Sequence, residues 1–205
     1  RAAAWLMLGA HGECEQDCRR ALELDPKYVR GHLRLAKALL EQGRLPEAGQ
    51  ALRRAQQEVP GNAEVGAEAD KVNSVVCLME EGKGLLARGE FPQARALLAD
   101  AAGLTDAPAV SVLLAEAEIG LGHTDRALRI ALGAAKRDGT CAEAFTASSK
   151  ALYLNCDFEQ ALKHVKEALR LNPDDAGAGR TFKQMKRVQR AMGAAEAAAG
   201  RREFE

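Results

Sequence analysis

Aromatic residues and long apolar runs are both scarce in this chain of 205 residues. Aromatics make up only 4% of the sequence although hydrophobic residues make up 47%, because much of the apolar content is alanine. Strand-like runs of Val, Ile and Thr are absent, which argues against a β-sheet core. No apolar run approaches the roughly 18–20 residues that span a bilayer. We therefore expect an all-α protein with no membrane partner.

The chain also lacks an excess of charge of either sign. Lys plus Arg and Asp plus Glu both number 29, so the formal net charge is zero. Bulk electrostatic attraction to nucleic acid is therefore not indicated, and we expect no nucleic-acid partner. A basic stripe near the C-terminal end is interpreted as the solvated face of a helix. Its members are Arg180, Lys183, Lys186, Arg187 and Arg190.

The cysteines form no recognisable redox or metal-binding motif. There are five, at positions 14, 18, 77, 141 and 156, and no two make a CxxC pair. Cys14 and Cys18 share one helix face, but no further ligand is placed to complete a metal site. We therefore predict that all five are buried packing residues, with no bound metal or cofactor. A reducing, cytoplasmic or nuclear, compartment fits this pattern.

Motifs typical of enzymes are missing as well. The sequence has no HExxH, no Gly-rich phosphate loop and no Ser/His/Asp arrangement, and its four histidines lie far apart. The segment GKGLLARG contains glycines and a lysine, but not in the order of a phosphate-binding loop. We therefore expect a protein that is not an enzyme.

What the sequence does contain is a repeat. Small residues and prolines return after 34 residues, and this period with a closing proline is the signature of the tetratricopeptide repeat (TPR). The predicted fold is thus an all-α TPR solenoid of antiparallel helix pairs, whose extended concave surface suits peptide binding. The pairs that carry the period are Gly9 and Gly43, Ala21 and Ala55, Pro26 and Pro60, Ala127 and Ala161, and Ala134 and Ala168.

The period divides the chain into a single array of repeats. Both ends fall inside helical patterns, so we interpret the sequence as a segment of a longer protein. The predicted divisions are a partial repeat at 1–27, complete repeats at 28–61, 62–107, 108–139 and 140–173, and an extended helix with the start of another repeat at 174–205.

Two departures from the period predict unusually long helices. Gly43 and Gly89 are 46 residues apart, which is 12 more than one repeat, so residues 63–87 are predicted to form one extended helix. A second long helix is predicted from about Asp175 to Ala199, with the segment from Gly200 to Phe204 opening the next repeat. In the repeat between them, residue 156 is a cysteine at the position of the turn glycine.

Two arginines are the leading candidates for ligand binding. Arg30 and Arg34 stand one turn apart near the start of a predicted helix that faces the concave surface, and Lys37 follows one turn later. Two guanidinium groups at this spacing can hold two carboxylates in bidentate fashion. The positive end of the helix dipole disfavours these arginines but favours a bound anion. The alternative is that they are ordinary surface residues, or that they pair with Glu23, Asp25 or Glu41.

The segments RAAAWLMLGAHGECEQDCRRALELDPKYVRGHLRLAKALL and ALYLNCDFEQALKHVKEALRLNPDD resemble the TPR arrays of the DnaJ subfamily C co-chaperones. The resemblance extends over essentially the whole chain, including both long helices. It implies a non-enzymatic scaffold that binds the acidic C-terminal tails of the seventy- and ninety-kilodalton heat-shock chaperones. It also implies a J-domain further along the full chain. The His-Pro-Asp motif of that domain is not present in these 205 residues.

In this family the tails are held by a carboxylate clamp on three successive repeats. The resemblance implies that Arg30 and Arg34 are the basic pair of the last of these repeats, with Leu33 and Lys37 lining the same groove. The other clamp residues would precede Arg1. Counting back from the turn glycine places Val76 and Glu80 at the equivalent positions of the next repeat, so no second clamp is expected there.

Two other functions remain open from the sequence. One is a general TPR adaptor whose partner is not a chaperone, and the other is the TPR part of a thioredoxin-like redox protein. An HPD motif elsewhere in the full chain would favour the DnaJ co-chaperone, and a CxxC motif there would favour the redox protein. We expect a monomer in the cytoplasm, with the nucleus as a second location.

Overall fold

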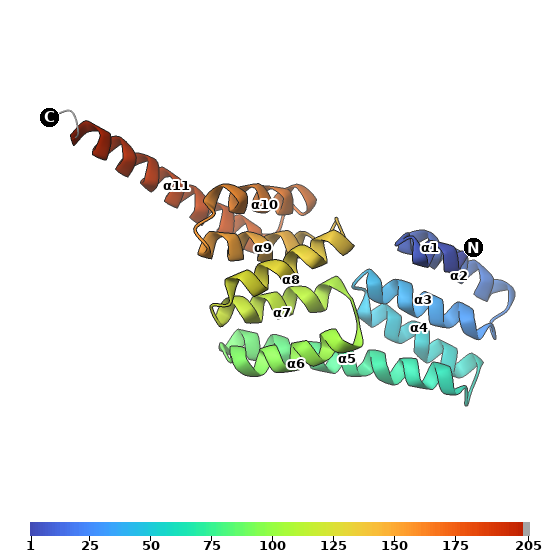
Figure 1. Cartoon of the computed structure of the whole chain (residues 1–205). Coiled ribbons are helices and arrows are strands. Elements are labelled where there is room, and N and C mark those ends of the chain that lie inside the picture. Colours follow the sequence, from blue (N-terminus) through green and yellow to red (C-terminus); the bar gives the residue numbers. More distant parts are fainter. Residues whose placement is uncertain (203–205) are drawn as a thin grey trace. The chain divides into compact units, whose positions relative to one another are not determined.

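The computed structural model describes the backbone of residues 1–202, and the side chains of residues 1–195 and 197–199. Within residues 1–202 the structure consists of eleven helices joined by short turns, with no strand (Figure 1). This confirms the all-α fold. The helices are α1 (Ala2–Met7), α2 (His11–Leu24), α3 (Val29–Glu41), α4 (Leu45–Glu58), α5 (Ala63–Arg88), α6 (Phe91–Leu104), α7 (Pro108–Gly120), α8 (Thr124–Arg137), α9 (Ala142–Leu154), α10 (Phe158–Leu171) and α11 (Ala176–Arg202).

The helix starts follow the sequence period. Helices α3 and α5 begin at residues 29 and 63, and α7, α9 and α11 begin at 108, 142 and 176, so three of these four steps are 34 residues. The remaining step spans α5, which has 26 residues where α3 has 13. The predicted extended helix over 63–87 is therefore confirmed.

The chain forms two compact units, one from Arg1 to Ala117 and the other from Glu118 onward. The boundary falls inside α7. The prediction that residues 1–205 form a single array, with the repeat divisions given above, stays a prediction.

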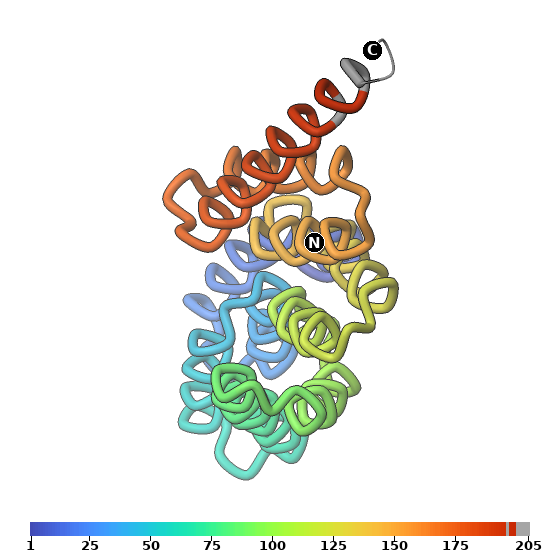
Figure 2. Tube along the Cα trace, turned by 90° about the vertical axis from the view of Figure 1, so that its left-hand side faces the viewer, coloured from blue at the N-terminus to red at the C-terminus, as the bar shows by residue number. Residues whose placement is uncertain are grey.

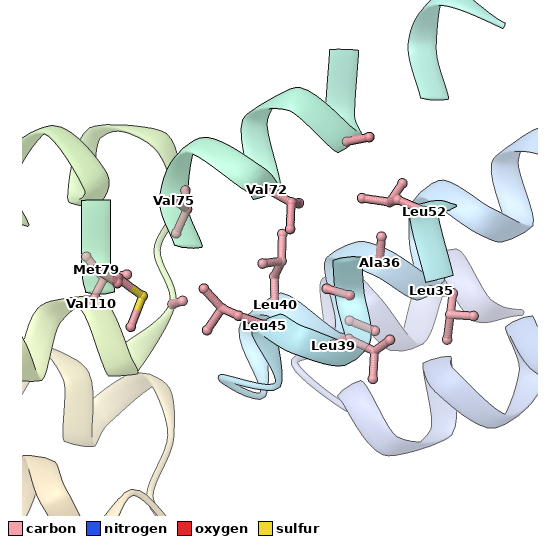
Figure 3. Packing of buried hydrophobic residues seen from close by; sticks show 14 of the residues in the cluster. Leu35, Ala36, Leu39, Leu40, Leu45, Leu52, Val72, Val75, Met79 and Val110 are labelled. Atoms are coloured by element: carbon pink, nitrogen blue, oxygen red, sulfur yellow. The ribbon is translucent and has the colours of Figure 1, made fainter. Parts of the chain in front are cut away.

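In the first unit, helices α2 to α5 enclose a core of leucine, valine and alanine (Figure 3). Figure 3 shows Leu40 of α3 pointing toward Val72 of α5. Ala48 and Ala55 of α4 are 0% exposed, so neighbouring helices enclose these small side chains. A second cluster joins the far half of α5 to α6, through Leu85 and Leu98.

In the second unit, α9, α10 and the first half of α11 pack together around Val165 and Met185. Beyond that, α11 continues away from the helices it packs on (Figures 1 and 2). It runs to Arg202, three residues beyond the predicted end at about Ala199, so Gly200 does not interrupt it. The preceding residues are mostly alanine, and a single glycine costs only about 1 kcal/mol in a helix. The repeat start expected at Phe204 lies outside the described residues.

The turns explain the spacing of the glycines. Gly9, Gly43, Gly89 and Gly122 all have φ between 72° and 78° in the turn within a helix pair, a conformation that glycine adopts without steric cost. Cys156 occupies the corresponding turn between α9 and α10 and has φ 64°. The predicted placement of Cys156 in the glycine position is therefore confirmed.

The strained turn at Cys156 gives a stability prediction. A residue with a side chain in the left-handed region costs the folded state about 1–2 kcal/mol. Glycine avoids this cost, but its more flexible unfolded state offsets part of the gain in stability. We expect Cys156→Gly to be more stable than Cys156→Ala by about 0.5–1 kcal/mol, because both lack the exposed thiol and only alanine keeps Cβ. Urea unfolding of the two variants measures the difference, and a more stable alanine variant would contradict it.

The close contact between α5 and α6 gives a second prediction. A Cβ on Gly82 would lie 2.8 Å from Cγ and Cδ2 of Leu98, whereas a Cβ on Gly84 would meet only the flexible end of Arg88, at 3.5 Å. We expect Gly82→Val to lower the free energy of unfolding by about 1–3 kcal/mol through overpacking. The matched variant Gly84→Val should stay within about 0.5 kcal/mol of the parent. Equal effects in thermal or urea unfolding would show that the contact does not constrain the helix pair.

Candidate functional site

The predicted binding residues lie on α3, whose start is shaped by Tyr28 and Gly31. A Cβ on Gly31 would stand 2.7 Å from Cδ1 of Tyr28, so the missing side chain makes room for the tyrosine ring against the helix. From there the Tyr28 hydroxyl accepts a hydrogen bond of 3.3 Å from Nη1 of Arg34. Gly31 thus lets Tyr28 orient one of the two candidate arginines.

All four predicted binding residues line one open groove, which we call the charged groove. Its volume is about 610 Å³. One wall is formed by α3 and the other by α5, two helices that pack in contact within the first unit. The α3 wall consists of Arg30, Leu33, Arg34 and Lys37, and the α5 wall of Glu64, Ala67, Glu68 and Lys71.

Within the part of the chain that the structure describes, the basic groups of the α3 wall have no acidic partner. Among the described side chains, no carboxylate lies within 4 Å of a charged nitrogen of Arg30, Arg34 or Lys37, so the pairs weighed with Glu23, Asp25 and Glu41 are not formed. Arg44, in the next turn, shows the contrast. Its Nη1 lies 2.6 Å from Oε2 of Glu15, and it also pairs with Glu47. The α3 wall is therefore free to bind an external anion.

The helix dipole adds to this preference. The first turn of α3 contains no acidic residue, and Tyr28 at the N-cap makes no side-chain capping bond. Arg30 instead places a positive charge where the dipole is already positive, which is unfavourable by about 0.3–1 kcal/mol at an exposed position. A bound carboxylate would relieve both charges at once.

The α5 wall was missed by the sequence analysis. Its four residues stand 34 positions after those of α3, so that Arg30 corresponds to Glu64 and Arg34 to Glu68. The expected equivalents, Val76 and Glu80, do not line the groove. The reason is that the extra residues of α5 extend its C-terminal half, so positions counted back from Gly89 fall too late. Counting forward from the start of the helix gives the correct pair.

Two of the five cysteines are buried as predicted, two are exposed, and Cys141 is half-buried. Cys14 and Cys18 of α2 are 0% and 1% exposed, and burial raises the pKa of the Cys18 thiol to about 12. Both thiols pack in the core of the first unit. Cys77 and Cys156 are exposed, which corrects the prediction that all five are buried. Cys77 lies off the buried stripe of α5, and Cys156 lies in a turn.

The second unit brings together a serine and a histidine that the sequence does not connect. Oγ of Ser148 lies 2.8 Å from Nδ1 of His164 and 3.0 Å from the carbonyl oxygen of Phe145. Ser148 is 0% exposed, and burial lowers the pKa of His164. A hydroxyl enclosed in this way links α9 to α10 and is not open to a substrate. The pair is therefore a packing contact.

Three other features bear on the choice of ligand. No cluster of His, Cys, Asp and Glu among the described residues has the makings of a metal site. None of the described helices is long and apolar enough to cross a bilayer. The basic stripe of α11 is solvated as predicted: Lys186 is half-buried beside the Phe182 ring, and its other four members are exposed.

Comparison with known proteins identifies the repeat. Two family models, each described as a tetratricopeptide repeat, match residues 6–68 and 112–176. Together they match more than half of the 205 residues. This chain belongs to the tetratricopeptide-repeat family. The unmatched stretch between the two models contains most of α5, where the extra turns interrupt the repeat.

The TPR chain is similar to two DnaJ proteins over most of its length. It is 31% identical over 180 residues to DnaJ homolog subfamily C member 7 of Homo sapiens, which covers 85% of this chain and 35% of that protein. It is 27% identical over 205 residues to subfamily C member 3 of Gallus gallus, covering 96% and 40%. The chain thus spans between a third and two fifths of the length of these relatives.

Solved structures agree on the fold. The TPR domain of P58(IPK) superposes with a TM-score of 0.70 at 23% identity, over 96% of this chain and 56% of that one. The second TPR domain of human RPAP3, in complex with the HSP70 peptide SGPTIEEVD, has a TM-score of 0.51 at 17% identity and covers 57% and 98%. The first TPR of Spaghetti (RPAP3), bound to the HSP90 peptide SRMEEVD, has a TM-score of 0.51 at 18% identity and covers 57% and 94%.

Proposed function

We propose that this TPR segment is a non-enzymatic scaffold that binds acidic peptides through the charged groove. The observation that supports this is the presence of Arg30, Arg34 and Lys37 on one wall of an open groove, without a carboxylate partner among the described side chains. Leu33 lies between the charges and offers apolar contact to the peptide. An extended peptide with two or more carboxylates satisfies this wall, because each guanidinium can bind one carboxylate through two parallel hydrogen bonds.

The partners we propose are the C-terminal tails of heat-shock chaperones of the seventy- and ninety-kilodalton classes. Support comes from the similarity to DnaJ subfamily C proteins over 85% of the chain or more. The peptides bound to two proteins of the same fold, SGPTIEEVD and SRMEEVD, have the acidic ends that such a groove would take. On this proposal the segment brings a chaperone and its co-chaperone together, and no bond is made or broken.

The proposal is tested by removing the arginine pair. We expect the 205-residue chain to bind SRMEEVD, and Arg30→Ala/Arg34→Ala to weaken that binding at least about tenfold, or ~1.4 kcal/mol, since two charge-assisted contacts are lost. Calorimetric titration measures the change, and circular dichroism checks that the variant is folded.

The matched control is Arg20→Ala/Arg53→Ala. It removes two exposed arginines of the same unit that do not line the groove, so it has the same effect on net charge. Equal weakening by both double variants would mean that Arg30 and Arg34 act only through the overall charge of the protein. Unchanged affinity in Arg30→Ala/Arg34→Ala would exclude the α3 wall as the binding surface.

A further inference from the structure

The two walls of the charged groove carry opposite charges at one end and like charges at the other. At the end where both helices begin, Arg30 and Arg34 face the same space as Glu64 and Glu68. One to two turns further along, Lys37 and Lys71 are both basic. The groove is therefore mixed in charge at one end and purely basic at the other.

The acidic side chains of the α5 wall do not neutralise the arginines directly. Neither Glu64 nor Glu68 comes within 4 Å of a charged nitrogen among the described side chains, so both carboxylates lie open to a ligand. Glu64 is exposed and Glu68 is half-buried. A peptide that carried only carboxylates would be repelled by this pair where it approached the start of α5.

We propose that the charged groove selects peptides in which a basic side chain stands near the acidic cluster. The acidic groups would lie against Arg30, Arg34 and Lys37, and the basic group against Glu64 and Glu68. The inference rests on the proposed function, because it concerns the same groove, and it adds a preference among acidic tails for those that also carry a basic residue.

The spacing of the groove fits such a peptide. Packed helices are separated by roughly 8–10 Å, and an extended peptide advances about 3.3 Å per residue. A basic and an acidic residue two positions apart are thus about 7 Å apart along the backbone, and their side chains cover the remaining distance to the two walls. In SRMEEVD the arginine stands two positions before the first glutamate, whereas SGPTIEEVD has no basic residue.

Leu33 and Ala67 support the same mode of binding. They are 34 positions apart and lie on opposite walls between the charged residues. Side chains two positions apart in an extended peptide point to the same face, so the apolar stems of the basic and acidic side chains would pack on Leu33 and Ala67. The charged ends would then reach the groups of opposite charge on the two walls.

A double-mutant cycle between protein and peptide tests the proposal. The peptides are SRMEEVD and SQMEEVD, which differ only in the basic residue. The proteins are the 205-residue chain and its Glu64→Gln/Glu68→Gln variant, which removes the acidic pair while keeping side-chain size. We expect the parent chain to prefer the arginine peptide by roughly two- to fivefold, the range of exposed ion pairs, and the variant to bind both peptides equally. Calorimetric titration measures all four affinities.

The matched control is Glu80→Gln/Glu81→Gln, which removes two carboxylates from the same helix outside the groove and should keep the preference of the parent chain. Equal binding of both peptides by the parent chain would overturn this inference and leave the proposed function standing. A preference that survives in Glu64→Gln/Glu68→Gln would also overturn it. If neither peptide bound the parent chain, the proposed function would fail, and this inference with it.

Discussion

The close approach of neighbouring helices at alanine positions is the contact on which the rest of this structure depends. Ala48, Ala127 and Ala161 stand at matching places in three second helices of repeats, and each is 0% exposed. With 4% aromatics, the chain has few large side chains to fill wide gaps between helices. Its core therefore combines leucine and valine with many alanines, and the repeat fixes where the alanines fall.

This packing also determines what the surface can offer. In α3 the buried stripe of Leu35, Leu39 and the intervening small residues faces α2, α4 and α5, so the remaining face carries the long charged side chains. Arg30, Arg34 and Lys37 are placed by a rigid helix rather than by a loop. Their positions are thus set by the same period that sets the core, and the charged groove forms where this face meets α5.

Much of this fold could be predicted from the sequence because its signals are local. Turn glycines, helix-opening prolines and buried alanines each act within a few residues, and even Cys156 could be placed in its left-handed turn by position alone. The arginine pair could be found in the same way, since one helical turn separates its members. The exposure of Cys77 could not be predicted in this way, because it depends on which face of α5 other helices cover.

Features that join distant segments were not accessible to the same reasoning. Ser148 and His164 meet only because α9 packs on α10, and no motif marks the pair. Glu64 and Glu68 were overlooked for a different reason. The period was counted from the turn after the helix, although the residues that α5 shares with α3 are in register from its start. An insertion shifts the positions after it relative to those before it. Counting from the turn after the insertion therefore gave the wrong residues, whereas counting from the start of α5 gives the right ones.

The length of α5 then has a physical interpretation. Its first half, through Ala69 and Val72, packs with the helices before it and carries the acidic wall of the groove. Its second half, through Gly82 and Leu85, packs on α6. The extra turns lie in the second half, so they lengthen the helix without moving the acidic pair away from the arginines. The insertion lies beyond the groove and therefore leaves the groove intact. As a result, the acidic wall of α5 still faces the basic wall of α3.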